Sequence, residues 1–227
     1  MRPKPKLTIG MISMLDRVSG QQYLPKMLQQ LKNQVDGVDD VEVIVLVDNQ
    51  YTSTGEKRNQ LIELAQGDFI CMVDDDDMLA PDYASCILEA IRRAPDSHVV
   101  VFDSAFHVDG VRRATTRWGL EYDWLDDLPN KRLFRPACHF CAWRTEFVQD
   151  VKFSDDYRGS DAIWVNRMLE KVHGHGDWTD AGPVDIKQTR IEKALYIYMA
   201  RTDNDSCSDA HKKYRDSEIK EHTMVVK

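Results

Sequence analysis

The sequence predicts an α/β fold in which helices flank a mostly parallel central sheet. Apolar, β-branched runs alternate with segments of helical periodicity through the first hundred residues, and this alternation indicates βαβ units. Residues 41–47, VEVIVLV, are almost continuously apolar, as is typical of a strand buried on both faces of a parallel sheet. The chain has 227 residues, of which 42% are hydrophobic and 30% charged, and this composition excludes fibrous and disordered classes.

Residues 1–103 form the regular half of the predicted fold. Strands are expected at residues 6–14, 41–47, 69–73 and 98–102. Helices are expected from Tyr23 to Leu31 with Pro25 near the start, from Gly55 to a left-handed cap at Gly67, and from Asp82 to Arg93. This order predicts right-handed crossovers between parallel strands. Residues 1–103 are therefore interpreted as a nucleotide-binding half of the fold.

The regular alternation stops after residue 103. Asp109-Gly110 has the chemistry of a hairpin turn, and short strands are expected around Leu133 and Ala142. A helix is expected at residues 160–171, a late strand at 194–199, and a polar tail from residue 203 onward. Without a repeat or linker, residues 1–227 are interpreted as one domain, with an irregular half at 104–202 and a tail at 203–227.

Charge, hydropathy and cysteine content bear on the binding partners, the location and the redox environment of the protein. The 38 acidic and 30 basic residues leave a formal charge of −8, which argues weakly against nonspecific nucleic-acid binding. No apolar run approaches the roughly 18 residues that span a bilayer, and no cleavage signal follows the start, so a cytoplasmic location is expected. Five cysteines, odd in number and sparse, suit reduced thiols better than disulfides.

Acidic residues follow three of the predicted strands. They are Asp16, Asp48 and the run Asp74 to Asp77. Because ligands bind at the carboxyl ends of strands in open α/β sheets, these acids mark one candidate site. Four adjacent carboxylates repel one another unless a cation compensates them, and oxygen ligands suit Mg²⁺ or Mn²⁺. The alternative is a solvated acidic turn before the helix at Asp82.

Three motifs then carry a family resemblance. They are Gly55-Glu56-Lys57-Arg58-Asn59, Ala65-Gln66-Gly67-Asp68-Phe69-Ile70, and Val73-Asp74-Asp75-Asp76-Asp77 with Pro81 beyond. In this order the motifs resemble those of family 2 glycosyltransferases with the GT-A fold, and the resemblance runs over residues 6–94. It implies a Rossmann-like nucleotide-sugar-binding half, followed by an irregular half that receives the acceptor.

The resemblance implies several contacts with the donor nucleotide. Asp48 would hydrogen-bond the base, and Arg58 would lie near the base and diphosphate. Asp74 and Asp75 would approach the ribose. Asp16, which stands where the family commonly has asparagine, is placed with this donor-binding group. The alternative for Arg58 is a solvated residue at the start of a helix, a position that suits the helix dipole poorly.

The resemblance also implies a metal, Mn²⁺ or Mg²⁺. Asp76 would ligate the ion that bridges the donor's phosphates, and Asp77 would share that work. The family's closing histidine, which is sometimes a metal ligand, falls on Arg201 in this sequence. The third protein ligand is therefore open, and Arg201 could instead fork onto the diphosphate.

A general base is implied at Asp161. Gly159-Ser160-Asp161-Ala162 resembles the family's acidic pair before a helix, although Ser160 and Ala162 depart from its usual glutamate and tryptophan. Asp155 and Asp156 are the fallback positions. The structural alternative for Asp161 is a carboxylate in the first turn of a helix, where it favours the helix dipole.

Two further groups of residues have simple structural alternatives. Cys138 and Cys141, with His173 and His175, could bind zinc, but the spacing fits no standard finger, and packed cysteines beside surface histidines are the commoner arrangement. Most tryptophans are core residues. Trp118 and Trp124 are the better candidates for stacking on a sugar or base.

The expected activity is inverting, metal-assisted transfer of a sugar from a nucleotide diphosphate sugar, with a UDP-sugar expected, to an acceptor hydroxyl. One alternative is a noncatalytic module that binds a nucleotide or glycan. Another is metal-dependent nucleotidyl transfer, which normally needs a glycine-rich loop after the first strand, where MISMLDRVSG has one glycine. The acceptor is open among a saccharide, a lipid carrier, a protein and a modified nucleobase, as is the oligomeric state.

Overall fold

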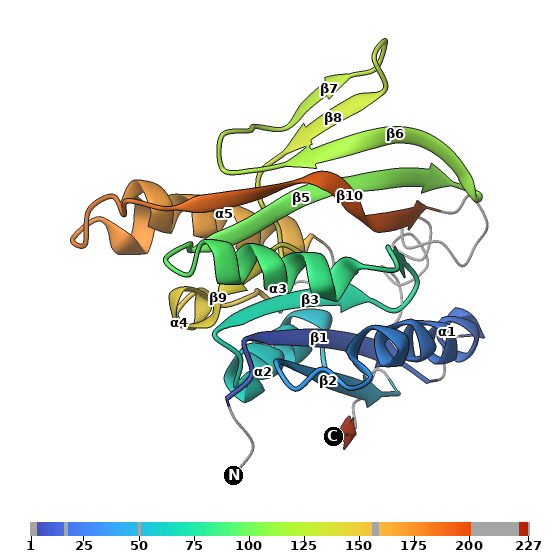
Figure 1. Cartoon of the computed structure of the whole chain (residues 1–227). Helices are drawn as coiled ribbons and strands as arrows, with labels where there is room; N and C mark the ends of the chain where they lie inside the picture. Colours follow the sequence, from blue (N-terminus) through green and yellow to red (C-terminus); the bar gives the residue numbers. More distant parts are fainter. Residues whose placement is uncertain (1–3, 16–17, 50, 156–158, 201–222, 227) are drawn as a thin grey trace.

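One mixed β-sheet with helices on both faces organises the molecule (Figure 1). The computed structural model describes residues 4–15, 18–49, 51–155, 159–200 and 223–226. The sheet has 11 strands, and its main path runs β11-β2-β1-β3-β9-β5-β6-β8-β7, with β10 and β4 pairing beside it. The predicted alternation of strands and helices in the first hundred residues is confirmed.

The centre of the sheet is parallel, as predicted. It consists of β1 (Leu7–Met14), β2 (Val41–Asp48) and β3 (Phe69–Asp74). β1 lies between the other two strands, with Met14 opposite Asp48 and Ile12 opposite Asp74. This register brings the carboxyl ends of all three strands to one edge of the sheet.

Helices cover both faces of this centre (Figure 1). On one face lie α1 (Val18–Val35) and α3 (Tyr83–Arg93), and on the other lie α2 (Thr54–Leu64) and α5 (Ser160–His173). α1 begins five residues before the predicted start, so Pro25 lies inside the helix and not in its first turn. There it removes one backbone hydrogen bond that packing against the sheet has to offset.

Gly67 does not form the predicted left-handed cap. α2 ends at Leu64, and its C-cap residue Ala65 is extended, with φ −60° and ψ 126°. Gly67 instead permits a close approach, because a Cβ atom there would lie 2.6 Å from the backbone nitrogen of Thr8. Its N–H group donates to the Thr8 hydroxyl at 2.9 Å.

The second half extends the sheet. Its strands are β4 (Met78–Leu79), β5 (Val99–Val108), β6 (Val111–Trp118), β7 (Leu125–Asp127), β8 (Arg132–Arg135), β9 (Ala142–Arg144) and β10 (Gln188–Ala200), with the short helices α4 (Thr145–Val148) and η1 (Gly176–Trp178). The predicted hairpin joins β5 to β6, and Asp109 and Gly110 take φ values of 50° and 76°, as a type I′ turn requires. β6, β8 and β7 form an arm at the far edge of the sheet (Figure 1).

Two strands differ from the sequence prediction. β10 has 13 residues, begins six residues before the predicted position, and runs parallel to β5. Most of the predicted polar tail lies outside the described residues, but β11 (Thr223–Val226) pairs antiparallel with β2. In the parts of the chain that the structure describes, no helix has the length and apolar character needed to cross a membrane.

Candidate functional site

The candidate site lies at the edge of the sheet where β1, β2 and β3 end. The acidic run forms a turn directly after β3, in which the Asp77 N–H donates to the Asp74 carbonyl at 3.4 Å. β10 returns to this turn, because Tyr196 and Ile197 pair with Leu79 and Met78 of β4. Residues from both halves of the chain therefore surround the four aspartates.

Asp74 is held by two basic side chains. Arg58 of α2 donates from Nη2 to its Oδ1 at 2.9 Å, and His139 Nε2 lies 3.5 Å from its Oδ2. Burial opposes ionisation of Asp74, but Arg58 and then His139 outweigh it and hold the pKa of this carboxyl well below its usual range. Arg58 is only 6% exposed, so the solvated alternative for this residue is wrong.

Asp75 is fixed from β1. It is 7% exposed, and its Oδ2 accepts a hydrogen bond of 2.6 Å from the Ser13 hydroxyl. Because Ser13 lies near the end of β1, this bond attaches the acidic turn to the neighbouring strand.

Asp77 is held from β10. Its Oδ2 accepts from the Tyr196 hydroxyl and its Oδ1 from the Met199 amide, both at 2.7 Å. The Tyr196 hydroxyl also accepts from the Asp74 N–H at 3.2 Å. Burial, followed by the charges of Asp76 and Asp74, raises the pKa of Asp77 well above its ordinary value. Negative charge is thus crowded on this side of the turn.

Asp48 forms a buried ion pair with Lys57. The two charged atoms lie 2.6 Å apart, and the side chains are 0% and 2% exposed. The other oxygen of Asp48 accepts from the Thr52 amide at 2.8 Å, and Lys57 Nζ also donates to the Ser13 carbonyl at 3.2 Å. This geometry anchors the segment after β2, and a contact between Asp48 and a nucleotide base stays a prediction.

Asp161 lies in the first turn of α5 and is exposed to solvent. Burial lowers the pKa of Arg58, but Asp74 and then Asp161 raise it, with a net increase. The fallback residue Asp155 precedes α5 in the chain and lies beside the start of α2, where the hydroxyl of the N-cap residue Ser53 donates to it at 3.5 Å. Asp16, Asp156 and Arg201 lie outside the described residues.

Comparisons with known proteins agree with this geometry. Residues 52–151 match the family model described as glycosyl transferase family 2, and they include α2, the acidic turn and His139. The fold is similar to two crystal structures of TarS residues 1–349 from S. aureus. The complex with UDP-GlcNAc gives a TM-score of 0.60 and 14% identity over 87% of this chain, and the complex with UDP gives 0.58 and 14% over 86%.

Residues 52–151 are therefore similar to glycosyl transferase family 2, and the chain has the GT-A fold. It spans 59% and 60% of the chains in these two TarS structures. The uncharacterized protein y4gI of Sinorhizobium fredii is 24% identical over 227 residues, which cover 93% of this chain and 23% of that protein.

The GT-A site fits a divalent cation. Asp76 and Asp77 offer oxygen ligands, and the crowding that raises the pKa of Asp77 is what a cation would relieve. Within the described ranges, no group of three or more His, Cys, Asp or Glu side chains is arranged to hold a metal. One or two carboxylates are typical of a magnesium-like site that substrate phosphates complete.

The zinc alternative receives no support from the described residues. Cys138 and Cys141 are buried free thiols, whereas His173 and His175 are exposed at the end of α5. This is the arrangement of packed cysteines beside surface histidines.

Four residues of the site have no role predicted from the sequence: Ser13, Lys57, His139 and Tyr196. Lys57 stands next to Arg58 in a motif already quoted, but a lysine in a helix is usually solvated. His139 lies 81 residues from Arg58, and its Nε2 is 3.3 Å from the Arg58 guanidinium. Such a contact leaves no local sequence signal.

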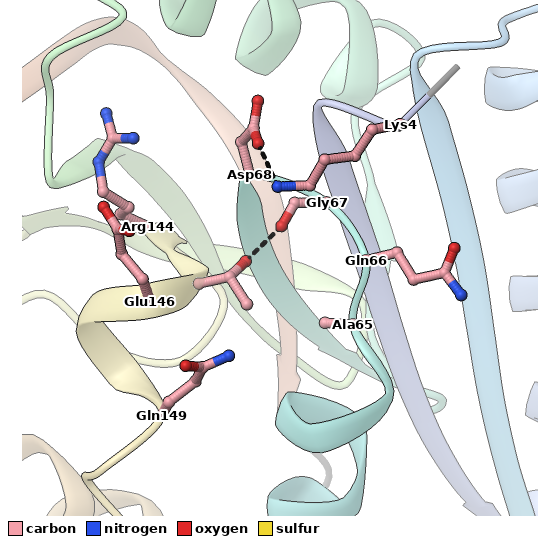
Figure 2. A pocket seen from close by; sticks show the side chains of 9 residues that line it. Lys4, Ala65, Gln66, Gly67, Asp68, Arg144, Glu146 and Gln149 are labelled. Atoms are coloured by element: carbon pink, nitrogen blue, oxygen red, sulfur yellow. Dashed lines mark hydrogen bonds and ion pairs between the residues drawn. The ribbon is translucent and has the colours of Figure 1, made fainter. Parts of the chain in front are cut away.

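A separate polar cavity of about 380 Å³ opens at the other end of β3 (Figure 2). Lys4, Asp68, Arg144 and Glu146 are among its lining residues. Lys4 and Asp68 form an ion pair of 2.7 Å, and Arg144 donates to the Ser97 carbonyl. The cavity lies away from the acidic turn, and its charges are largely satisfied by the protein itself.

Proposed function

We propose that this chain is an inverting glycosyltransferase that uses a nucleotide diphosphate sugar. The observation that carries the proposal is the acidic turn, which is held in a fixed geometry by side chains from α2, β1 and β10 within a family 2-like fold. Sites held by packed and hydrogen-bonded neighbours are preorganised for binding. The TarS complexes with UDP and UDP-GlcNAc support a uridine donor.

Asp74 and Asp75 are the proposed ribose contacts. Arg58 and His139 keep Asp74 ionised, and Ser13 orients Asp75, so both carboxylates can accept hydrogen bonds from ribose hydroxyls. Arg58 is only 6% exposed, and its primary role in this proposal is to position Asp74.

Asp76 and Asp77 are the proposed ligands for Mn²⁺ or Mg²⁺, together with the diphosphate of the donor. When bound, such an ion neutralises the charge that develops on the departing diphosphate. Tyr196 and the Met199 amide orient Asp77 for this role.

Asp161 is the proposed general base. Its carboxylate takes the proton of the acceptor hydroxyl while that oxygen forms a bond to the anomeric carbon, and the bond from this carbon to the diphosphate breaks. The nucleoside diphosphate leaves with the bonding electrons. A single displacement inverts the configuration at the anomeric carbon.

The test combines binding with turnover. Thermal unfolding is measured with UDP, GDP, CDP and dTDP, each with and without Mn²⁺, and UDP release is measured from UDP-sugars. We expect UDP with Mn²⁺ to raise the melting temperature most. Asp161→Asn should keep this shift but lose at least about 100-fold in transfer rate, since general bases typically contribute that much.

Three outcomes contradict the proposal or a part of it. If no nucleotide raises the melting temperature, this is not a nucleotide-sugar site. If UDP binds but no donor is turned over, the noncatalytic alternative is favoured. If Asp161→Asn abolishes UDP binding, its assignment as the base is wrong.

A further inference from the structure

A pair of stacked aromatic rings lies beside the acidic turn. Phe106 of β5 and Tyr198 of β10 are register partners, and their ring centroids are 5.7 Å apart with an angle of 13° between the planes. Tyr198 is 39% exposed and lies near the end of β10, two residues before its last residue Ala200. This pair therefore presents an aromatic surface to solvent.

The exposed ring is close to the carboxylates. Tyr196 and Tyr198 point to the same face of β10, about 7 Å apart, because side chains alternate along a strand. Tyr196 donates to Asp77, and the amide of Met199 donates to the other oxygen of the same carboxylate. Asp77 is thus hydrogen-bonded by Tyr196, two residues before Tyr198, and by Met199, which follows it.

A second pair of stacked rings lies on the same strand, at Tyr196. Phe140 stacks on Tyr196 with centroids 4.4 Å apart and planes at 7°, and Trp118 meets Phe140 edge-on at 4.7 Å. Tyr196 is 0% exposed, so this second pair belongs to the core. Trp118, one of the two tryptophans expected to stack on a ligand, is taken up by this core and by its bond to the Ser104 hydroxyl at 2.9 Å.

The position of the Phe106–Tyr198 pair in the sheet decides which side of the acidic turn it lies on. In the strand order, β2 and β1 lie on one side of β3, whereas β5, paired with β10, lies on the other. The proposed nucleotide contacts lie at the ends of β1, β2 and β3. The Phe106–Tyr198 pair is on the β5 side of the acidic turn, which the proposed nucleotide contacts leave open for a second substrate.

We propose that Tyr198, supported by Phe106, is a stacking platform for a pyranose ring of a saccharide acceptor. This inference rests on the proposed function. A pyranose has a face of C–H groups that packs on an aromatic ring, while its hydroxyls need polar partners at the edge of the ring. In this proposal the partly exposed Tyr198 ring supplies the apolar surface, and the acidic turn, which the neighbouring Met199 amide contacts, supplies the polar partners.

The experiment compares Tyr198→Ala with Tyr198→Phe. The probes are UDP-GlcNAc or UDP-glucose as donor, methyl β-D-glucopyranoside or its N-acetylglucosamine counterpart as acceptor, and glycerol as an acceptor without a ring. We expect Tyr198→Ala to raise the KM for the glycosides about tenfold, with kcat within about twofold and the KM for glycerol unchanged. Tyr198→Phe keeps the ring and should keep the wild-type KM.

Leu128→Ala is the control. Leu128 is a large apolar residue that is 69% exposed between β7 and β8 of the arm, and no role in binding is assigned to it. Its removal should leave both KM values and UDP affinity unchanged.

Binding is also measured without turnover, by saturation-transfer NMR of the methyl glycosides on the UDP-loaded protein with Mn²⁺. If the wild type releases no UDP from either donor but binds glycosides through Tyr198, the proposed activity fails and the platform stands. If the wild type releases UDP but neither binds nor uses a glycoside, the platform is wrong. Equal effects of Tyr198→Ala on glycosides and glycerol, or a loss of UDP affinity, also overturn it.

Discussion

Two carboxylates at the sheet edge are held by different partners, and their pKa values shift in opposite directions. Asp74 lies against Arg58, whereas Asp77 lies against a hydroxyl, an amide and two further aspartates. A cationic neighbour stabilises the ionised form, and like charge with burial destabilises it. The pKa of Asp74 is therefore lowered and that of Asp77 is raised, although both are aspartates of the same turn.

The Asp48–Lys57 pair gives a stability prediction. Lys57→Met should cost about 3–5 kcal/mol in the free energy of unfolding, because it leaves a buried charge without its partner. Combining it with Asp48→Asn should recover much of the loss, since the pair is then removed as a whole. Urea unfolding measures both.

Lys152→Met is the control for this prediction. Lys152 pairs with Glu63 at 2.9 Å, but the two side chains are 46% and 64% exposed. Exposed pairs contribute about 0–1 kcal/mol. A Lys57→Met variant that loses no more than Lys152→Met would contradict the role assigned to the buried pair.

Asp77 gives a prediction about pH. Its pKa is raised on folding, so the native state binds more protons than the unfolded state above pH ~4, and stability falls as the pH rises toward the native pKa. Asp77→Asn replaces this carboxyl group with an amide that does not ionise, so the variant lacks this contribution to the pH dependence. The stability of the wild type relative to this variant should therefore decrease as the pH rises from about 4.

Urea unfolding between pH 4 and 8, without divalent cations, measures this difference. Asp76→Asn removes the first charge that raises the Asp77 pKa, so it should weaken the pH dependence. A constant difference between wild type and Asp77→Asn across this range would show that Asp77 is ionised normally in the folded protein.

At the scale of elements, α2 joins three strand ends through two consecutive residues. Lys57 reaches Asp48 and Ser13 at the ends of β2 and β1, and Arg58 reaches Asp74 at the end of β3. Both side chains are buried, so this helix packs on the sheet through ionic contacts as well as through Leu61 and Ile62. The placement of α2 therefore sets the geometry of the acidic turn.

The connection from α2 to β3 depends on Gly67. Gly67→Ala should destabilise the fold by roughly 2–3 kcal/mol, because the added methyl group would lie 2.6 Å from the Thr8 nitrogen, and backbone cannot move aside as a side chain can. Thermal or urea unfolding measures the loss. The neighbouring Gln66→Ala, at an exposed position, should stay within about 0.5 kcal/mol. Equal effects of the two substitutions would contradict the close approach.

At the scale of the whole molecule, the acid excess has a specific location. The formal charge is −8, and the structure brings Asp74 to Asp77 together with the base candidate Asp161 around one edge of the sheet. A cation and a nucleotide bound there would stabilise the folded state in proportion to their affinity, about 2.7 kcal/mol at a 100-fold excess over Kd.

Asp76→Asn tests this linkage. We expect UDP affinity in the presence of Mn²⁺ to fall about tenfold or more, because a neutral amide is a weaker ligand for a hard cation than a carboxylate. Isothermal titration calorimetry with and without Mn²⁺ measures it. Asp126→Asn, on the arm and paired with Arg135, should bind like the wild type. Wild-type Mn²⁺ dependence in Asp76→Asn would assign the ligand to another residue.

The sequence by itself determined the parallel centre of the sheet, the helices that flank it and the acidic run after β3. These features depend on local periodicity and on residues that are neighbours in the chain. Its errors were local too: the start of α1 and the role of Gly67 depend on packing that periodicity does not report.

Only the tertiary structure decided how the carboxylates are held. Tyr196 lies 119 residues from Asp77, His139 lies 81 residues from Arg58, and β11 returns from the end of the chain to β2. Such contacts form when distant strands pair, so no sequence window contains both partners. The pKa shifts of Asp74 and Asp77 follow from these long-range pairings.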